Sequence, residues 1–99
     1  MSELDVAIEA AYEAGNSILE IYEGKYETFT KSDDSPITEA DLKSNEIIKA
    51  ILSKTNHKIL SEEDKDDQKR LSEEIIWIVD PLDGTSDFID KTGEFTVMI

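Results

Sequence analysis

The segment that decides the fold spans residues 75–85 and reads IIWIVDPLDGT. Its first part, Ile75 to Val79, is entirely apolar, and an unbroken apolar run of this length predicts a strand buried on both faces of a sheet. Asp80 follows at the point where this strand leaves the core, where an isolated carboxylate would be costly to bury. Pro81 has no amide hydrogen to give to a sheet, so we expect the strand to end and the chain to turn there.

The turn after Pro81 predicts a group of side chains suited to a phosphate and a hard cation. It brings Asp83 back toward Asp80, which places two carboxylates close together. Gly84 lets the backbone approach a ligand closely, and Thr85 can open a short helix whose first N–H groups have no partner within the helix. Oxygen ligands beside such N–H groups favour a divalent cation that holds a phosphate.

These residues resemble the metal-binding signature of an enzyme family. The sequence DPLDGT at 80–85 is similar to that of the inositol monophosphatase superfamily, a group of magnesium-dependent, lithium-sensitive phosphatases. Three further blocks are similar to the CysQ branch, the 3'(2'),5'-bisphosphate nucleotidases: SPITEAD at 35–41, LSEED at 60–64 and GEFTV at 93–97. The four blocks keep the order and spacing of that branch from about Lys31 onward, which makes the resemblance specific.

The resemblance implies an α/β fold of mixed helix and sheet layers, the N-terminal portion of the layered αβαβα sugar-phosphatase-like fold. The chain has 99 residues, enough for one domain with a modest core, whereas members of the family are considerably longer. We therefore expect residues 1–99 to be the N-terminal, metal-binding part of a phosphatase domain. On this expectation a C-terminal half, in the same or a second chain, completes the enzyme, and residues 1–99 alone are catalytically incompetent.

Composition argues against several other classes of protein. The net charge of -14 disfavours binding of a nucleic-acid polymer or an anionic membrane through a basic surface. The chain has no cysteine, so neither a disulfide scaffold nor a thiolate site is possible. It has no apolar stretch long enough to span a membrane, and its acidic N-terminus lacks the apolar segment of a signal peptide. We expect a cytoplasmic protein, with peripheral membrane association left open.

Two helices are expected before the signature. The first is capped by Ser2 and closed by Gly24, and its apolar residues recur at helical spacing. That spacing predicts a buried face made of Leu4, Ile8, Ala11, Ala14, Ile18 and Tyr22. The second helix is expected to begin at a capping box of Thr38 and Asp41 and to run through Leu52.

Short strands and one short helix complete the prediction. Residues 25–30 alternate in the manner of a strand, and residues 31–36 have the composition of a turn. Further strands are expected at 59–60 and 95–99, and a short helical segment at 86–90. Together these elements predict mixed α/β layering.

Two acidic residues outside the signature are candidates for the same site. Glu62 directly follows the strand at 59–60, just as Asp80 follows its own strand. Two neighbouring strands would thus bring carboxylates to one sheet edge, where α/β proteins tend to bind ligands. Asp41 lies in a first helical turn, where a carboxylate commonly acts only as a cap. The resemblance implies instead that Asp41 helps to activate an attacking water, and the two roles are compatible.

The remaining acidic residues of this region are weaker candidates for the site. Glu63 is interpreted as a neighbour of the site rather than as a ligand. Runs of acidic residues usually form solvated loops, and we interpret Asp64, Asp66 and Asp67 in this way.

The resemblance implies a role for each site residue. The implied metal ligands are Glu62, Asp80, the Leu82 carbonyl and Asp83. The implied catalytic residues, which would orient the attacking water, are Asp41, Glu62 and Thr85. The implied substrate-binding residues are Glu62, Leu82, Asp83, Gly84 and Thr85. The implied cofactor is Mg²⁺, in a two-metal arrangement that needs no covalent phospho-enzyme.

The function implied by the resemblance is that of a 3'(2'),5'-bisphosphate nucleotidase, a phosphoric monoester hydrolase. Its partner would be a small phosphorylated nucleotide, 3'-phosphoadenosine 5'-phosphate, which it would convert to AMP and phosphate. One alternative is an inositol monophosphatase or another sugar-phosphate phosphatase of the same superfamily, since most specificity residues are expected beyond Ile99. An alternative of a different class is a non-catalytic acidic metal-binding or interaction module, although the EF-hand pattern is absent.

Overall fold

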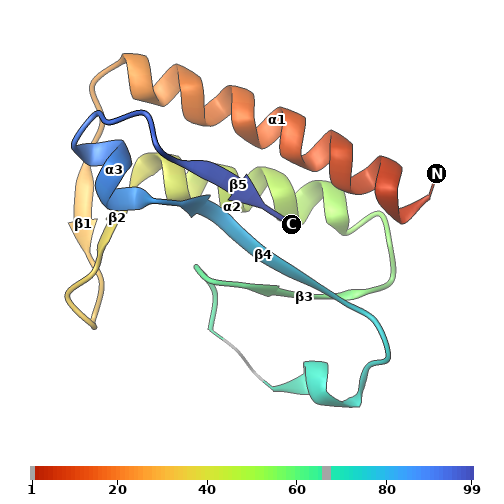
Figure 1. Ribbon diagram of the computed structural model, residues 1–99. Helices are drawn as coiled ribbons and strands as arrows, with labels where there is room; N and C mark the ends of the chain where they lie inside the picture. The colour runs from red at the N-terminus through yellow and green to blue at the C-terminus, as the bar shows by residue number, and fades with distance from the viewer. Residues whose placement is uncertain (1, 66–67) are drawn as a thin grey trace.

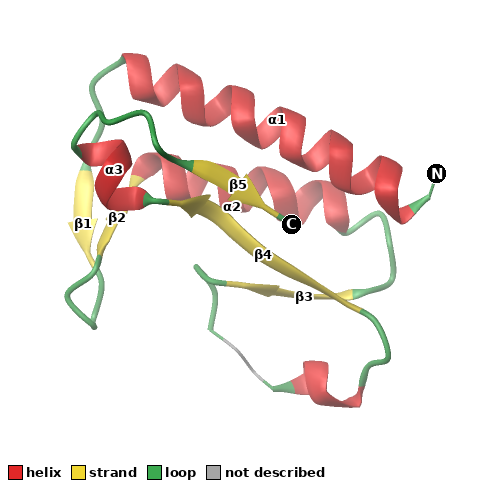
Figure 2. Ribbon diagram, in the orientation of Figure 1, coloured by secondary structure: helices red, strands yellow, loops and turns green. Residues whose placement is uncertain are grey.

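The computed structural model describes residues 2–65 and 68–99, and its elements form mixed helix and sheet layers (Figures 1 and 2). In chain order they are α1 (Glu3–Glu23), β1 (Thr28–Thr30), β2 (Pro36–Thr38), α2 (Glu39–Leu52), β3 (Lys58–Ser61), the 3-10 helix η1 (Lys69–Ser72), β4 (Ile76–Asp83), α3 (Thr85–Ile89) and β5 (Thr96–Met98). Helices α1 and α2 lie against one face of the sheet formed by β3, β4 and β5 (Figure 1). This layering confirms the α/β class expected from the sequence.

Both ends of α1 lie where the sequence predicts them. The Ser2 hydroxyl accepts the Asp5 N–H at 3.2 Å, and the Asp5 carboxylate accepts the Ser2 N–H at 3.3 Å, which forms a reciprocal cap. At the other end the Gly24 N–H donates to the Ile21 carbonyl. No helix in the described ranges is long and apolar enough to cross a membrane.

The predicted buried face of α1 is wrong in part. Leu4 and Ile8 are 68% and 57% exposed. The residues that α1 buries are Val6, Ala10, Ala14 and Ile18. Ala10 and Ala14 belong to the same core cluster as Ile48 and Leu52 of α2, because small side chains let the two helices approach closely. The helix carries two apolar stripes, and contact with α2 determines which one is buried.

Strands β1 and β2 form an antiparallel hairpin in which Phe29 lies opposite Ile37. The strand expected at 25–30 is therefore present but covers only its second half. The strand at Pro36–Thr38 is not predicted by the sequence, because the turn composition of residues 31–36 hides its start. The hairpin packs beside α3 at one end of the molecule (Figure 1).

The larger sheet has the strand order β3-β4-β5. Strands β3 and β4 are parallel, with Ser61 opposite Val79, whereas β5 runs antiparallel to β4. The carboxyl ends of β3 and β4 therefore meet at one sheet edge. This arrangement confirms the expectation that the two strands are neighbours.

Two expectations for β4 are wrong. The strand runs on to Asp83 instead of ending at Asp80, because its pairing with β5 shifts between these two positions. Pro81 falls within that irregularity, where its missing N–H breaks no ladder hydrogen bond. The strand is also not buried on both faces: Val79 is buried under the helices, whereas Ile78 is 65% exposed on the opposite face.

Gly84 gives a first prediction, on stability. Its φ of +92° disfavours any L side chain, and an added Cβ would lie 2.7 Å from the Glu94 carbonyl oxygen. We expect Gly84→Ala to lower the free energy of unfolding by at least about 2 kcal/mol, because the strain alone costs on the order of 1–3 kcal/mol. The measurement is urea denaturation.

Two other glycines supply matched controls for that variant. Gly93 has φ of +81° but open space around its Cβ position, so Gly93→Ala should show the backbone strain alone. Gly15 lies within α1 with no atom within 4 Å of an added Cβ, so Gly15→Ala should stabilise the protein by up to about 1 kcal/mol. Equal losses for Gly84→Ala and Gly93→Ala would contradict the predicted clash with Glu94.

Candidate active site

One hollow of about 220 Å³ brings Glu62 together with the signature residues. It is lined by Lys31, Ser35, Pro36, Glu62, Asp80, Leu82, Asp83, Gly84, Thr85 and Ser86. The parallel pairing of β3 with β4 causes this convergence, since the Glu62 N–H donates to the Val79 carbonyl at 3.0 Å. Glu62 and Asp80 therefore leave the sheet at the same edge, as the sequence predicts.

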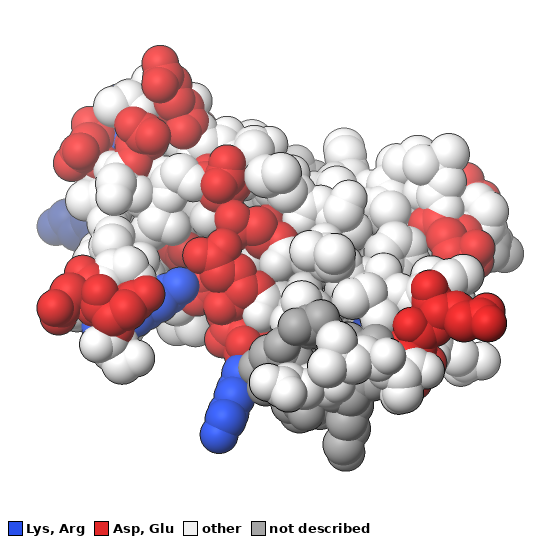
Figure 3. Space-filling model, turned by 60° about the horizontal axis from the view of Figure 1, so that its bottom comes forward, with Lys and Arg blue, Asp and Glu red and all other residues white. Residues whose placement is uncertain are grey.

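A second, wider hollow of about 690 Å³ lies on the exposed face of the sheet. Glu62, Asp80 and Asp83 line both hollows, and apolar residues of the three strands form much of the remaining wall. Acidic side chains gather in a band on the face of the molecule seen in Figure 3. The three carboxylates predicted as metal ligands thus stand between a small polar hollow and a larger, more apolar one.

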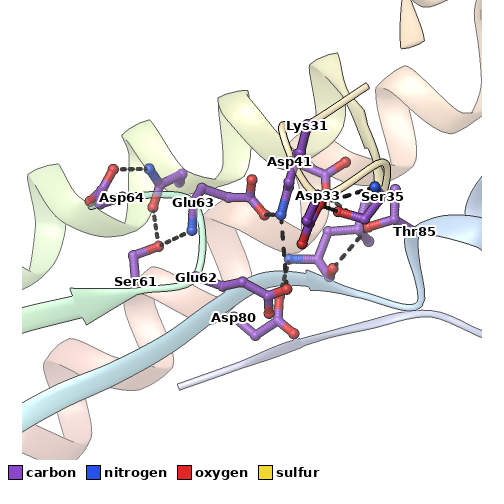
Figure 4. Close-up of polar contacts among 12 residues, drawn as sticks. Lys31, Asp33, Ser35, Asp41, Ser61, Glu62, Glu63, Asp64, Asp80 and Thr85 are labelled. Carbon is purple, nitrogen blue, oxygen red and sulfur yellow. Dashed lines mark hydrogen bonds and ion pairs between the residues drawn. The ribbon is translucent and has the colours of Figure 1, made fainter. Parts of the chain in front are cut away.

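The carboxyl groups of Glu62 and Asp80 contact one another directly (Figure 4). Partial burial, the hydrogen bond with Glu62 and the negative charges of Glu62 and Asp83 raise the pKa of Asp80 to about 7. The Leu82 N–H donates to Asp80 at 3.3 Å and opposes this rise only in part. Near neutral pH the pair therefore holds a proton readily, as two carboxyls do when no cation lies between them.

Asp41 caps α2 and also contacts the signature. Its Oδ2 accepts the Thr38 N–H at 2.8 Å and the Thr38 hydroxyl at 2.7 Å. Its Oδ1 accepts the Thr85 hydroxyl at 2.8 Å, which is shorter than the 3.3 Å from that hydroxyl to the Leu82 carbonyl. Asp41 is buried and does not line the small hollow. The cap predicted from the sequence is confirmed, and Asp41 reaches the site through Thr85.

Lys31 is a candidate site residue that the sequence analysis does not identify. Its ammonium lies 3.0 Å from Glu63 and 3.9 Å from Glu62 (Figure 4). Burial lowers the pKa of Lys31, but the hydrogen bond with Glu63 and the charges of Glu63, Glu62 and Asp33 together outweigh burial, and the net pKa is raised. A lone cation between a strand and an acidic turn is a weak signal, because only the tertiary structure brings it to Glu62.

Glu63 is buried, as its interpretation as a neighbour of the site suggests. Its side chain is only 3% exposed, and burial raises its pKa although Lys31 acts in the opposite direction. Its Oε2 has no hydrogen-bond partner among the described residues.

Helix α2 holds both strand ends through two further polar residues that the sequence analysis does not identify. The Ser44 hydroxyl donates to the Pro81 carbonyl at 2.7 Å. The Asn45 carbonyl accepts the Ser61 hydroxyl at 2.6 Å, and its amide donates to Asp64 at 3.0 Å. The available signal is spacing: Asp41, Ser44 and Asn45 lie on the same helix face as the buried Ile48 and Leu52.

The interpretation of Asp64 as a solvated loop residue is wrong. Its carboxylate accepts the Asn45 amide and pairs with Lys49 at 2.8 Å. The turn after β3 brings it against α2, which sequence composition does not reveal. Asp66 and Asp67, which have the same interpretation, lie outside the described residues.

The donor set fits a hard divalent cation, although no cage is preformed. Glu62, Asp80 and Asp83 offer carboxylate oxygens and Leu82 a carbonyl, the oxygen ligands that Mg²⁺ prefers. A cation bound between Glu62 and Asp80 would offset the repulsion between their carboxylates. Within residues 2–65 and 68–99, however, no group of three or more His, Cys, Asp or Glu side chains is arranged to hold a metal ion. The assignment of these ligands stays a prediction.

Comparison with known proteins identifies a family and a fold. The model of the inositol monophosphatase family matches residues 1–99. A 3'(2'),5'-bisphosphate nucleotidase CysQ of Escherichia coli K12 is 39% identical, and one of Salmonella typhimurium is 41% identical. Each alignment covers 97% of this chain and 41% of the relative. The chain thus spans about two fifths of the length of these curated relatives.

Solved structures agree with the family match. The crystal structure of CysQ from Bacteroides thetaiotaomicron, described as a bacterial member of the inositol monophosphatase family, has 52% sequence identity and a TM-score of 0.78. That match covers 93% of this chain and 34% of the CysQ chain. An IMPase from Thermotoga maritima has a TM-score of 0.81 at 23% identity, which supports the fold alone.

The contact between Asp80 and Glu62 generates a prediction on pH. Folded Asp80 keeps its proton up to about pH 7, whereas its ordinary pKa is 3.8. The contribution of Asp80 to the free energy of unfolding is thus greatest at low pH and falls as the pH rises from about 4 to 7, with no further change from this group above that range. In the absence of divalent cations, Asp80→Asn should therefore have a higher melting temperature than the parent at pH 8.

The control for this prediction is Glu13→Gln, which removes an exposed carboxylate of α1 far from the hollow. The advantage of Asp80→Asn over the parent should shrink toward zero near pH 4, whereas Glu13→Gln should follow the parent at every pH. A melting temperature of Asp80→Asn below that of the parent at pH 8 would contradict the predicted unfavourable contact between ionised Asp80 and Glu62.

Proposed function

This chain belongs to the inositol monophosphatase family, and we propose that it forms the N-terminal, metal-binding part of a Mg²⁺-dependent 3'(2'),5'-bisphosphate nucleotidase. The proposed reaction is hydrolysis of 3'-phosphoadenosine 5'-phosphate by water to give AMP and phosphate. The observation that carries the proposal is the convergence of Glu62, Asp80, Asp83 and Thr85 on one hollow. The names of the CysQ relatives support this substrate class over inositol phosphates.

Mg²⁺ would be held by the three carboxylates of Glu62, Asp80 and Asp83 and by the Leu82 carbonyl. When bound, the cation would supply positive charge and Lewis acidity at the scissile phosphate. The residues of the chain would hold the cation and the phosphate and would orient the attacking water. The Asp80 proton that is retained near pH 7 would have to leave before the carboxylate could serve as a ligand.

Thr85 and Asp41 are proposed to orient the attacking water. Because the Thr85 hydroxyl donates its only hydrogen to Asp41, its oxygen lone pairs remain able to accept a hydrogen bond from water. Asp41 is buried and held by Thr38, so the orientation of this pair is set before substrate binds. Glu62, largely exposed at the edge of the hollow, would accept the second hydrogen of the same water.

The substrate phosphate is proposed to lie against Gly84 and Thr85, at the start of α3. The close approach of Gly84 to the Glu94 carbonyl leaves no space there for a side chain. Lys31, which lines the same hollow, would add a positive charge near the phosphate. The adenosine would extend toward residues that these relatives carry beyond the matched region.

The test of this function is phosphate release by the intact protein. We expect turnover of 3'-phosphoadenosine 5'-phosphate with Mg²⁺, inhibition by Li⁺ and little or no turnover with Ca²⁺, which tolerates looser coordination and orients water poorly. Faster hydrolysis of inositol 1-phosphate would instead assign the protein to the inositol phosphatases. Failure to hydrolyse either substrate would leave a non-catalytic metal-binding module as the better account.

Asp83→Asn is the variant that tests the ligand set. It should lower turnover by more than about 100-fold, since the loss of a residue that merely supports a ligand already costs roughly 10- to 100-fold. It should also abolish the rise in melting temperature that Mg²⁺ causes in the parent. The matched control is Asp90→Asn at the exposed end of α3. Near-normal activity of Asp83→Asn would show that the ligand assignment is wrong.

A further inference from the structure

The turn that carries Glu62 has few anchors of its own. The Glu62 side chain is 56% exposed, and the chain has just left β3 at Ser61. Within the turn, the Asp64 N–H donates to the Ser61 carbonyl at 3.1 Å. The Glu62 N–H donates to Val79 at 3.0 Å, which ties one point of the turn to β4. Lys31 pairs with Glu63 at 3.0 Å and holds the middle of the turn. The place of the Glu62 carboxylate also depends on what holds Ser61 and Asp64 at the two ends of the turn.

A single amide side chain holds both ends of this turn. Asn45 accepts the Ser61 hydroxyl at 2.6 Å through Oδ1 and donates to Asp64 Oδ1 at 3.0 Å through Nδ2. The Ser61 oxygen in turn accepts the Glu63 N–H at 3.3 Å. Asn45 and Ser61 are both buried, so water competes little for these bonds. The bridge needs an acceptor and a donor on separate atoms of one short side chain, which the Asn45 amide provides.

The same face of α2 also holds the other half of the site. Asp41 accepts the Thr85 hydroxyl, and Ser44 donates to the Pro81 carbonyl between Asp80 and Leu82. The side chain of Asn45 thus completes a set of contacts from one rigid helix to the turn after β3 and to the end of β4.

We propose that Asn45 is a positioning residue for Glu62, which sets the distance between the Glu62 carboxylate and the carboxylates of the β4 signature. This inference rests on the proposed function, because it assigns to Asn45 an effect on Mg²⁺ binding by Glu62, Asp80 and Asp83. Asn45 itself contacts neither hollow. Its effect is exerted through Ser61 and Asp64.

The test uses the direction of the hydrogen bonds. Asn45→Asp keeps an acceptor for Ser61 but loses the donor and faces Asp64 with a second carboxylate. Asp64→Asn keeps an oxygen that can accept the Asn45 amide, and loses only the charge that pairs with Lys49. The double variant Asn45→Asp with Asp64→Asn reverses donor and acceptor and restores the bridge.

We expect Asn45→Asp to raise the Mg²⁺ concentration needed for half-maximal activity by roughly 10- to 100-fold, the usual effect of losing a residue that supports a ligand. Asp64→Asn should change this Mg²⁺ concentration little, and the double variant should bring it most of the way back to the value of the parent. The second readout is independent of activity: the Mg²⁺ concentration that gives half of the rise in melting temperature should shift in the same order among the three variants.

A control separates positioning from simple loss of stability. Ile47→Ala truncates a partly buried residue of α2 that packs on the core and whose apolar side chain forms none of the hydrogen bonds of the bridge. It should lower the melting temperature and leave both Mg²⁺ midpoints unchanged. If Asn45→Asp does not fold, Ser61→Ala carries the same test, because it removes the hydroxyl that donates to Asn45.

The outcomes distinguish this inference from the proposed function. Unchanged Mg²⁺ midpoints for Asn45→Asp, or for Ser61→Ala, in a parent that hydrolyses the nucleotide would overturn the role of Asn45 alone. An absence of rescue in the double variant would also overturn it. A parent that shows neither Mg²⁺-dependent turnover nor Mg²⁺-dependent stabilisation would instead overturn the proposed function and the inference together.

Discussion

The hydrogen bond from Thr85 to Asp41, with its neighbours on α2, sets the relative positions of the site residues. Asp41, Ser44 and Asn45 are buried polar side chains on a helix face that is otherwise apolar. Buried polar groups must find partners, and here the partners are the end of β4 and the turn after β3. The requirement to satisfy these groups therefore orients the helix, the strands and the site at the same time.

The electrostatic arrangement of the site includes unfavourable contacts between acidic groups. Glu62 and Asp80 contact one another although both are acids. The buried Glu63 side chain pairs with Lys31 through Oε1, whereas its Oε2 has no partner among the described residues. In a chain of net charge -14, bringing these acidic groups together does not stabilise the folded state. Such local conflicts are typical of functional sites, where geometry serves a ligand rather than the fold. A bound cation would convert the repulsion into attraction.

The sequence by itself determined the features that depend on neighbouring residues. The capping boxes at Ser2 and Thr38 mark the starts of both long helices, since a cap involves only residues a few positions apart. The apolar runs before Glu62 and Asp80 indicate two strands, and their parallel pairing brings the two carboxylates to one edge. The four sequence blocks also indicate the family, which the comparisons confirm.

Only the tertiary structure decided which of several locally equivalent surfaces is buried and which polar groups meet. The stripe of α1 that contains Ala10 is buried rather than the one that contains Leu4, because α2 packs against the smaller side chains. Ile78 is exposed because the helices cover a single face of β4. Asn45 and Asp64 meet 19 positions apart in the chain. Contacts over such separations depend on how whole elements pack, which a local pattern of residues does not encode.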